Sequence, residues 1–270
     1  MSIKTKLISA LKIVIWLSLL SGTGFLLFFV NEKHGETVCK NVEININHSN
    51  DNCFVSVEEV KSLIFQSGDS LKSQKMSKIN LENVKNKILE NPFIKKVKIY
   101  STIDGEVKIS ITQKKPLIRV FTAKGQSFYL DEDGFAMPIS DKNTARVIIA
   151  TGKITPDSIS QSFIDEKDTL KQREVLKKSN LTMLYQLAKI IDTSAFWKAQ
   201  ISQVNINDRG EMELLPLLGS HVILLGTNEN LVEKFEKLFL FYKKELSNFG
   251  LSKYKEINIK FKDQLICSKK

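Results

Sequence analysis

The sequence predicts an α+β fold in three parts: a single N-terminal transmembrane helix, a β-α-α-β-β module, and a mostly antiparallel β domain with flanking helices. Three observations predict it. Residues 13–30 carry no formal charge, two alternating strand patterns flank Asp104-Gly105, and a strand-rich pattern with repeated turn residues follows Pro116. The 270 residues, 42% of them hydrophobic, are enough for the cores of two modest domains.

The N-terminal apolar run, Ile13–Val30, is a candidate membrane anchor. An α-helix needs about 20 apolar residues to cross a bilayer. Lys4, Lys6 and Lys12 precede the run, so the positive-inside rule predicts a cytoplasmic stub (1–12), a span (13–30) and a chain that continues outside the cytoplasm. A cleaved signal peptide and a buried core helix are the alternatives. The signal peptide is disfavoured because the run ends in Phe-Phe-Val and no Ala-x-Ala cleavage pattern follows. The length of the run favours a span over a core helix.

The β-α-α-β-β module is predicted to span residues 39–114, after a polar linker at 31–38. Apolar and polar residues alternate in "VEINI" (42–46), which indicates a strand. "SVEE" from Ser56 is a capping box that starts a first helix, and Asn80 is the predicted N-cap of a second. Asn91-Pro92 ends that helix, and the hairpin around Asp104-Gly105 completes the module.

The net charge of +10 suggests a polyanion as a partner. The lysines of the hairpin, however, alternate with apolar residues, as on the solvent-facing side of a sheet. Lys96, Lys98 and Lys108 alternate with apolar residues and are expected to face solvent. The same solvated face explains Lys95, Lys96, Lys114 and Lys115 better than contact with anionic lipid head groups does. Basic residues are not interleaved with aromatic ones, which disfavours nucleic acid.

The predicted β domain covers residues 115–270. Short strands are expected in "PLIRVF", in "SFYLDEDGFAMPIS" with its turn at Asp133-Gly134, and in "ARVIIATG". A helix at about 174–191, a three-strand meander with turns at 207–210 and 219–220, and a helix from Leu231 to Gly250 follow. The chain ends in a strand in which Ile257, Ile259 and Phe261 alternate with polar residues.

The sequence predicts no catalytic residue, no cofactor and no metal site. His34, His48 and His221 are expected to be surface or strand-edge residues without an oriented acid-base partner. No nucleophile elbow, HExxH or phosphate-binding loop occurs, and "DEDG" is too short for an EF-hand. The three cysteines lack metal-ligand spacing, and a Cys39–Cys53 disulfide is left open beside three separate thiols.

Four stretches resemble the FtsQ/DivIB family of bacterial cell-division proteins. Residues 81–120, "LENVKNKILENPFIKKVKIYSTIDGEVKISITQKKPLIRV", resemble a polypeptide-transport-associated (POTRA) domain. "SFYLDEDGFAMPIS", "GEMELLPLLGSHVILLG" and "INIKFKDQLIC" resemble the family's β domain. One departure is Asn258, where many relatives carry Asp, and it removes any salt bridge expected at that position.

The resemblance implies a non-enzymatic, single-pass scaffold of the inner membrane that acts in the divisome at the division septum, with its bulk in the periplasm. It implies recruitment of FtsB/FtsL-type coiled-coil partners and contact with other divisome membrane proteins. An edge strand can accept a partner strand through its free backbone groups. Matching positions place the partner-facing and supporting rows at Tyr254, Ile257, Ile259, Phe261 and Leu265, with the partner-facing side left open.

Two other functions compete with this one. A POTRA-containing component of outer-membrane protein assembly or secretion is expected to carry several POTRA copies or a barrel of amphipathic strands. A membrane-anchored envelope enzyme, the alternative of another class, would need an acid-base pair around His221.

Overall fold

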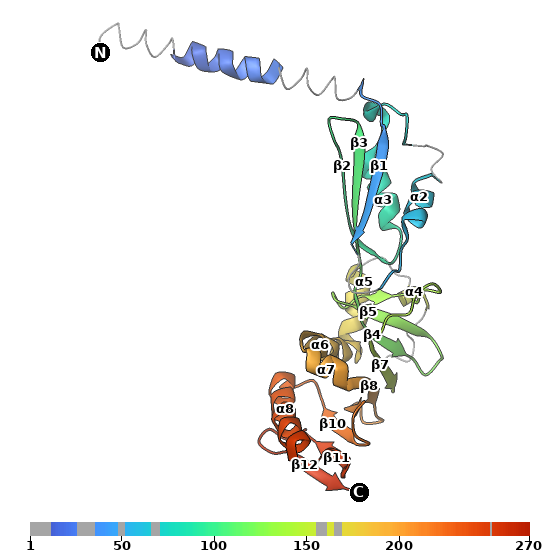
Figure 1. Ribbon diagram of the computed structural model, residues 1–270, viewed down its shortest axis with the longest axis vertical. Helices are drawn as coiled ribbons and strands as arrows, with labels where there is room; N and C mark the ends of the chain where they lie inside the picture. Colours follow the sequence, from blue (N-terminus) through green and yellow to red (C-terminus); the bar gives the residue numbers. More distant parts are fainter. Residues whose placement is uncertain are drawn as a thin grey trace, which may run out of the picture. The chain divides into compact units, whose positions relative to one another are not determined.

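The computed structural model describes residues 12–25, 36–47, 52–65, 71–154, 161–164, 169–248 and 250–270. The chain divides into two compact units, one containing residues 55–112 together with the chain up to 47, the other containing 48–54 and 113–270 (Figure 1). The α+β class is confirmed. The predicted stub at 1–12, His34 and His48 lie outside the described residues, except for Lys12.

The first unit is a three-stranded sheet with two α-helices beside it (Figure 1). Its strand order is β1-β3-β2, and β1 runs parallel to β3 with Val42 opposite Val107. The inward row of β3, Val107, Ile109 and Ile111, is at most 1% exposed. The elements are β1 (Asn41–Asn47), α2 (Val57–Phe65), the short 3-10 helix η1 (Met76–Lys78), α3 (Leu81–Leu89), β2 (Ile94–Ser101) and β3 (Glu106–Gln113).

Both helix starts form as the sequence predicts. Ser56 and Glu59 exchange hydrogen bonds, Ser56 N–H to Glu59 Oε2 at 2.9 Å and Glu59 N–H to Ser56 Oγ at 3.2 Å. Asn80 Oδ1 accepts the N–H of Asn83 at 3.0 Å. Each cap satisfies amide groups that the first helical turn leaves unbonded, so these boundaries are fixed by local chemistry.

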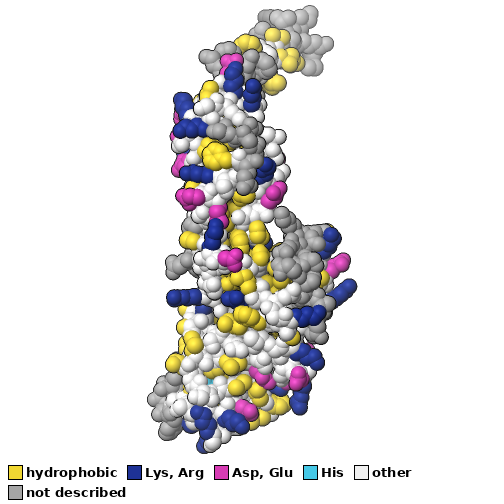
Figure 2. Space-filling view, turned by 90° about the vertical axis from the view of Figure 1, so that its right-hand side faces the viewer, with side chains coloured by type: hydrophobic (Ala, Val, Ile, Leu, Met, Phe, Trp, Pro, Cys, Tyr) yellow, Lys and Arg dark blue, Asp and Glu magenta, His cyan; other side chains and the backbone are white. Residues whose placement is uncertain are grey.

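The hairpin turn is confirmed, and so is the lysine face for Lys96, Lys98 and Lys108. The expectation was wrong for Lys114 and Lys115, which are part-buried and pair with Asp131 and Asp192. Gly105 has φ +87°, and a Cβ there would lie 2.6 Å from Val38 O, so only glycine fits. Lys96 and Lys98 are exposed. Lys108 lies opposite Glu43 in the sheet and pairs with it at 3.3 Å. Figure 2 shows Lys and Arg side chains interspersed with acidic ones on the face in view.

The second unit is built on a nine-stranded mixed sheet in the order β12-β11-β10-β9-β8-β7-β4-β5-β6. Neighbours pair antiparallel except β10–β11, β4–β7 and β7–β8, which are parallel, so the predicted mostly antiparallel sheet is confirmed. The strands are β4 (Pro116–Phe121), β5 (Ser127–Asp131), β6 (Ala136–Met137), β7 (Ile148–Gly152), β8 (Ile201–Ile206), β9 (Met212–Pro216), β10 (Val222–Gly226), β11 (Tyr254–Asn258) and β12 (Ile266–Lys269).

Helices cover this sheet and complete its core. They are α4 (Gln161–Ile164), α5 (Thr169–Lys177), α6 (Leu181–Thr193), α7 (Ala195–Gln200) and α8 (Leu231–Asn248). Leu184 and Leu187 of α6, Trp197 of α7, and Leu238 and Tyr242 of α8 are all at most 4% exposed and belong to one core cluster. Burying such side chains contributes about 1.5–3 kcal/mol each.

The prediction of one helix at 174–191 was wrong, because the chain breaks between α5 and α6. Ser179 Oγ accepts the N–H of Leu181 at 3.3 Å, and the side-chain amide of Asn180 donates to Lys153 O at 2.7 Å. Serine and asparagine side chains compete with the helical backbone for hydrogen bonds, which favours a helix start over a helix interior.

The turn between β5 and β6 depends on one buried carboxylate. Asp131 is 2% exposed, and its Oδ1 accepts the N–H groups of Asp133 at 3.0 Å and Phe135 at 2.8 Å. Burial raises the pKa of Asp131, although these amides and Lys114 Nζ, 3.8 Å from Oδ2, oppose the shift. The DEDG motif is therefore a hairpin turn held by its first aspartate.

The N-terminal region is described only in part. Residues 12–25 are helical, and residues 26–30 of the predicted span lie outside the described residues. Over the described residues, no helix combines the length and the apolar character needed to cross a membrane. Cys39, Cys53 and Cys267 are free thiols, and burial raises the pKa of Cys39.

Candidate functional site: the edge of the C-terminal sheet

The candidate site is the end of the large sheet formed by β10, β11 and β12. β11 pairs in parallel with β10, with Ile257 opposite Ile223, and antiparallel with β12, with Ile257 opposite Cys267. Within the described residues no strand lies beyond β12. This four-residue strand is therefore an open edge that carries unpaired backbone groups.

The hydrogen-bond pattern indicates which groups of β12 are free. Ile259 N–H donates to Leu224 O of β10 at 3.0 Å. Because the backbone groups of successive residues point to opposite sides of a strand, Ile257 also faces β10, whereas Asn258 faces β12. Cys267, opposite Ile257, is then in a non-hydrogen-bonded pair, so its N–H and C=O point toward the open edge.

Helix α8 holds the turn that leads into β12. Lys237 Nζ donates to three carbonyl oxygens of this turn, those of Phe261, Lys262 (3.3 Å) and Gln264 (3.2 Å). An ammonium group has three donors, so Lys237 uses all of them here. One side chain therefore fixes the chain path between β11 and β12.

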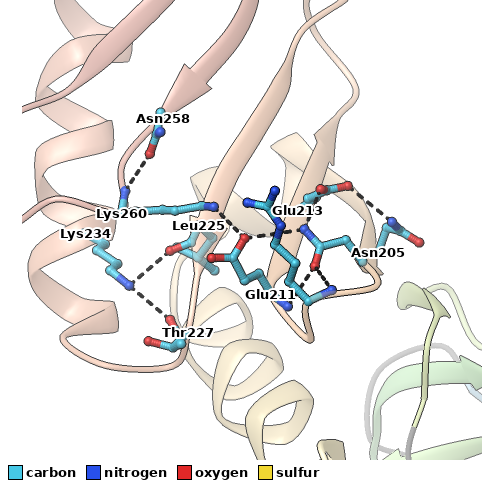
Figure 3. A network of polar contacts seen from close by, with 10 residues as sticks. Asn205, Glu211, Glu213, Leu225, Thr227, Lys234, Asn258 and Lys260 are labelled. Atoms are coloured by element: carbon cyan, nitrogen blue, oxygen red, sulfur yellow. Dashed lines mark hydrogen bonds and ion pairs between the residues drawn. The ribbon is translucent and has the colours of Figure 1, made fainter.

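Two more lysines anchor the same end of the sheet (Figure 3). Lys260 Nζ lies 2.5 Å from Glu211 Oε2, and this hydrogen bond lowers the pKa of Glu211. Lys234 is 8% exposed and donates to Leu225 O and Thr227 O, each at 3.0 Å. Burial lowers the pKa of Lys234. Asn258 Oδ1 accepts the Lys260 N–H at 3.0 Å, so the residue that departs from the family pattern caps the strand end.

The five predicted site residues fall into two groups. Ile257 and Ile259 are fully buried and Tyr254 is 7% exposed, so these three face the core. Leu265 packs partly buried against that core, and Phe261 is 46% exposed. The expectation that their strand lies at the sheet edge was wrong: β11 lies between β10 and β12, because residues 260–265 turn the chain back to form one more strand.

Sequence reasoning missed β12 itself and Lys237. The strand is only four residues long, and two of its residues, Ser268 and Lys269, are polar. The signal that was available is the second half of "INIKFKDQLIC", where the polar run Lys262-Asp263-Gln264 separates Phe261 from Leu265-Ile266.

His221, on which an enzyme reading depended, is a core residue and not a surface one. It is 3% exposed, and its Nε2 lies 2.7 Å from the hydroxyl of Tyr242. Burial lowers the pKa of His221 and raises that of Tyr242. Among the described residues, no group of three or more His, Cys, Asp or Glu is placed to hold a metal ion.

The fold defines the class first: a β-α-α-β-β unit followed by a mixed β unit that ends in an open edge strand. A family model described as "FtsQ/DivIB, C-terminal related" matches residues 115–268, and a "POTRA-like domain" model matches residues 37–112. The chain is also 26% identical over 217 residues to the cell division protein DivIB of Clostridium tetani (strain Massachusetts / E88), covering 77% of this chain and 75% of that protein. Because the first model covers more than half of the chain, the chain belongs to the FtsQ/DivIB family.

Proposed function

We propose that this protein is a non-enzymatic scaffold of the bacterial division machinery that recruits FtsB/FtsL-type coiled-coil partners by β-strand addition. The observation that carries the proposal is the open β12 edge in a chain of the FtsQ/DivIB family. A relative that matches three quarters of this chain is named a cell division protein, which supports the cellular role.

The edge suits strand addition for a specific reason. A partner strand would bond to the backbone of β12, beginning at Cys267, and backbone bonding would supply affinity without demanding a particular sequence. The exposed side chains of Phe261 and Ile266 (47% exposed) would flank the added strand and supply selectivity. Leu265 and the buried row of Tyr254, Ile257 and Ile259 would support the edge from the core side.

The proposed topology rests on the sequence. Residues 13–30 would form the single anchor in the inner membrane, with residues 1–12 in the cytoplasm and the linker and both domains, 39–114 and 115–270, in the periplasm. Such an anchor would place the β12 edge on the side of the membrane where septal division proteins assemble. These domain limits stay a prediction.

The proposal is tested by co-purifying the full chain in detergent with the organism's own coiled-coil division pair. Deletion of residues 266–270 removes β12 alone, and Phe261→Glu places a charge beside it. Both are expected to abolish co-purification, while Tyr100→Glu, a matched change of an exposed aromatic residue on β2 (53% exposed), is expected to retain it. Circular dichroism checks that each variant is folded. Retention of the partners by both edge variants would contradict the site, and their absence with the unaltered chain would contradict the function.

Two measurements test the proposed membrane topology. A reporter that is active only in the periplasm, fused after Lys270, is expected to be active, and the protein is expected to stay with the membrane in alkaline carbonate. An inactive reporter, or release by carbonate, would contradict the proposed anchor.

A further inference from the structure

A second surface of the β unit has the features of a binding groove and lies away from the β12 edge. It crosses the first residues of the parallel strands β4, β7 and β8, and α6 and α7 form one wall. Its volume is about 960 Å³, at the upper end of the range that ligand sites occupy.

The lining of the groove is mixed, and its apolar part continues the core of the β unit. Leu117, Ile148, Ile191 and Ile201 line it as buried members of the core, each at most 7% exposed. Leu217, at its rim, is 65% exposed, and Ile149 is 38% exposed although it lies in a central strand. Exposed aliphatic side chains that adjoin a core in this way favour contact with another apolar surface.

Among the charged residues that line the groove, Arg146 is the one without an ion-pair partner within the described part of the chain. Asp192 is paired through both oxygens, Oδ2 with Lys115 and Oδ1 with Lys198 at 2.9 Å. Burial alone would raise the pKa of Asp192, but the two lysines outweigh it and hold the pKa below its usual value. Arg146 lines the same groove, and among the described residues its side chain has no hydrogen-bond or ion-pair partner.

The backbone that carries Arg146 is fixed. Val147 N–H donates to Ala145 O at 3.1 Å, which closes a three-residue turn with Arg146 at its centre directly before β7. Ala145 N–H donates to the hydroxyl of Tyr129 at 3.3 Å, and Tyr129 is fully buried. The guanidinium is therefore presented from a rigid platform, which lowers the entropic cost of pairing it with a ligand.

We infer that this groove binds an extended segment of a partner protein that carries bulky apolar side chains and a carboxylate. The apolar side chains would cover Ile149 and Leu217, and the carboxylate would pair with Arg146, whose planar fork suits a carboxylate. The open rim and the width of three strands suit a peptide chain better than an enclosed small molecule. This site is separate from the β12 edge, and the inference does not depend on the proposed function.

The test selects random twelve-residue peptides, displayed on phage, against the full chain in detergent. The strongest binders are synthesised, and fluorescence anisotropy measures their affinities for the chain and its variants. A class of peptides rich in Asp or Glu and in Leu, Ile or Phe is expected. Its affinity is expected to fall at least tenfold in Arg146→Glu and in Ile149→Ser, and to change less than twofold in Arg209→Glu.

Arg209 is the matched control because it lies in the exposed turn at the opposite end of β8. Deletion of residues 266–270 is expected to leave the affinity of this class unchanged, which separates the groove from the β12 edge. Ile149→Ser keeps the charge pattern, so it tests the groove even where Arg146→Glu perturbs folding. Failure to select any peptide, or affinities that do not respond to both groove variants, would overturn the inference.

Discussion

Replacing Lys237 with methionine is predicted to loosen β12 while leaving the rest of the sheet intact. Lys237 Nζ donates to the carbonyl oxygens of Phe261, Lys262 and Gln264, in the turn that connects β11 with β12. Methionine keeps most of the aliphatic stem on α8 but leaves all three carbonyls to water. The change therefore removes the ammonium contacts and little apolar packing.

The free energy that β12 loses in Lys237→Met depends on how exposed these three hydrogen bonds are. A hydrogen bond to a charged group contributes about 1.5–3 kcal/mol. These three share one ammonium at the surface, where the freed carbonyls can bind water, so about 1–2 kcal/mol in total is expected. That energy raises the population of the opened edge roughly 5- to 30-fold.

Hydrogen exchange read by mass spectrometry measures the opening of β12 directly. Peptides that cover residues 262–270 are expected to exchange roughly 5- to 30-fold faster in Lys237→Met. Peptides of the β4–β5 hairpin serve as an internal reference. Lys244→Met, an exposed lysine on the same helix, is the control and is expected to leave exchange unchanged. Unaltered exchange at 262–270, or an equal rise across the whole sheet, would contradict the role of Lys237 in holding β12.

Three further predictions concern the stability of the β unit, each measured as the urea-unfolding free energy. His221 has a lowered folded pKa, so below its ordinary value of about 6.5 the unfolded chain takes up the proton first and stability falls as the pH falls. The drop between about pH 7.5 and about pH 5.5 is expected to be smaller in His221→Gln, and an equal drop would contradict this. Asp131→Ala leaves two part-buried amides without their acceptor and is expected to cost about 1–3 kcal/mol. Asp131→Asn keeps an acceptor oxygen and is expected to cost less, and the reverse order would contradict the turn assignment. Gly152 has φ +95°, and a Cβ there would lie 2.1 Å from Ile206 O, so Gly152→Ala is expected to cost about 2–5 kcal/mol. Gly210 has φ +76° but lies in open space, so Gly210→Ala is expected to cost about 1–2 kcal/mol. Equal costs would contradict the close approach of Gly152 to Ile206.

The parts of the fold that the sequence predicts correctly are those decided by neighbours in the chain. The Ser56–Glu59 capping box, the Asn80 cap and the Gly105 turn each depend on contacts within a few residues or on one backbone angle. The apolar rows of β3 and α8 follow from periodicity alone. The break before α6 is local only in part: Ser179 Oγ accepts the N–H of Leu181, but the side chain of Asn180 donates to Lys153 O, 27 residues away.

The site was harder to predict because distant segments build it. Whether the last strands lie at an edge depends on the pairing of β11 with β10 and β12. The alternation of apolar and polar residues does not determine either pairing. The position of His221 depends on Tyr242, 21 residues away, which converts an expected surface histidine into a core one. Arg146 stands out only once Asp192, the acid that lines the groove, is seen to pair with two lysines.

The most direct test of strand addition at β12 compares Cys267→Pro with Cys267→Val. Proline removes an N–H that points to the open edge and bonds to nothing in β11, so the pairing of β12 with β11 survives. Valine keeps that N–H with a side chain of similar polarity. If a partner strand bonds to the Cys267 backbone, the full chain's affinity for its coiled-coil division pair, measured by titration calorimetry, falls at least tenfold in Cys267→Pro and less than threefold in Cys267→Val. Equal affinities of the two variants, with β12 exchange protection retained in both, would contradict strand addition at β12.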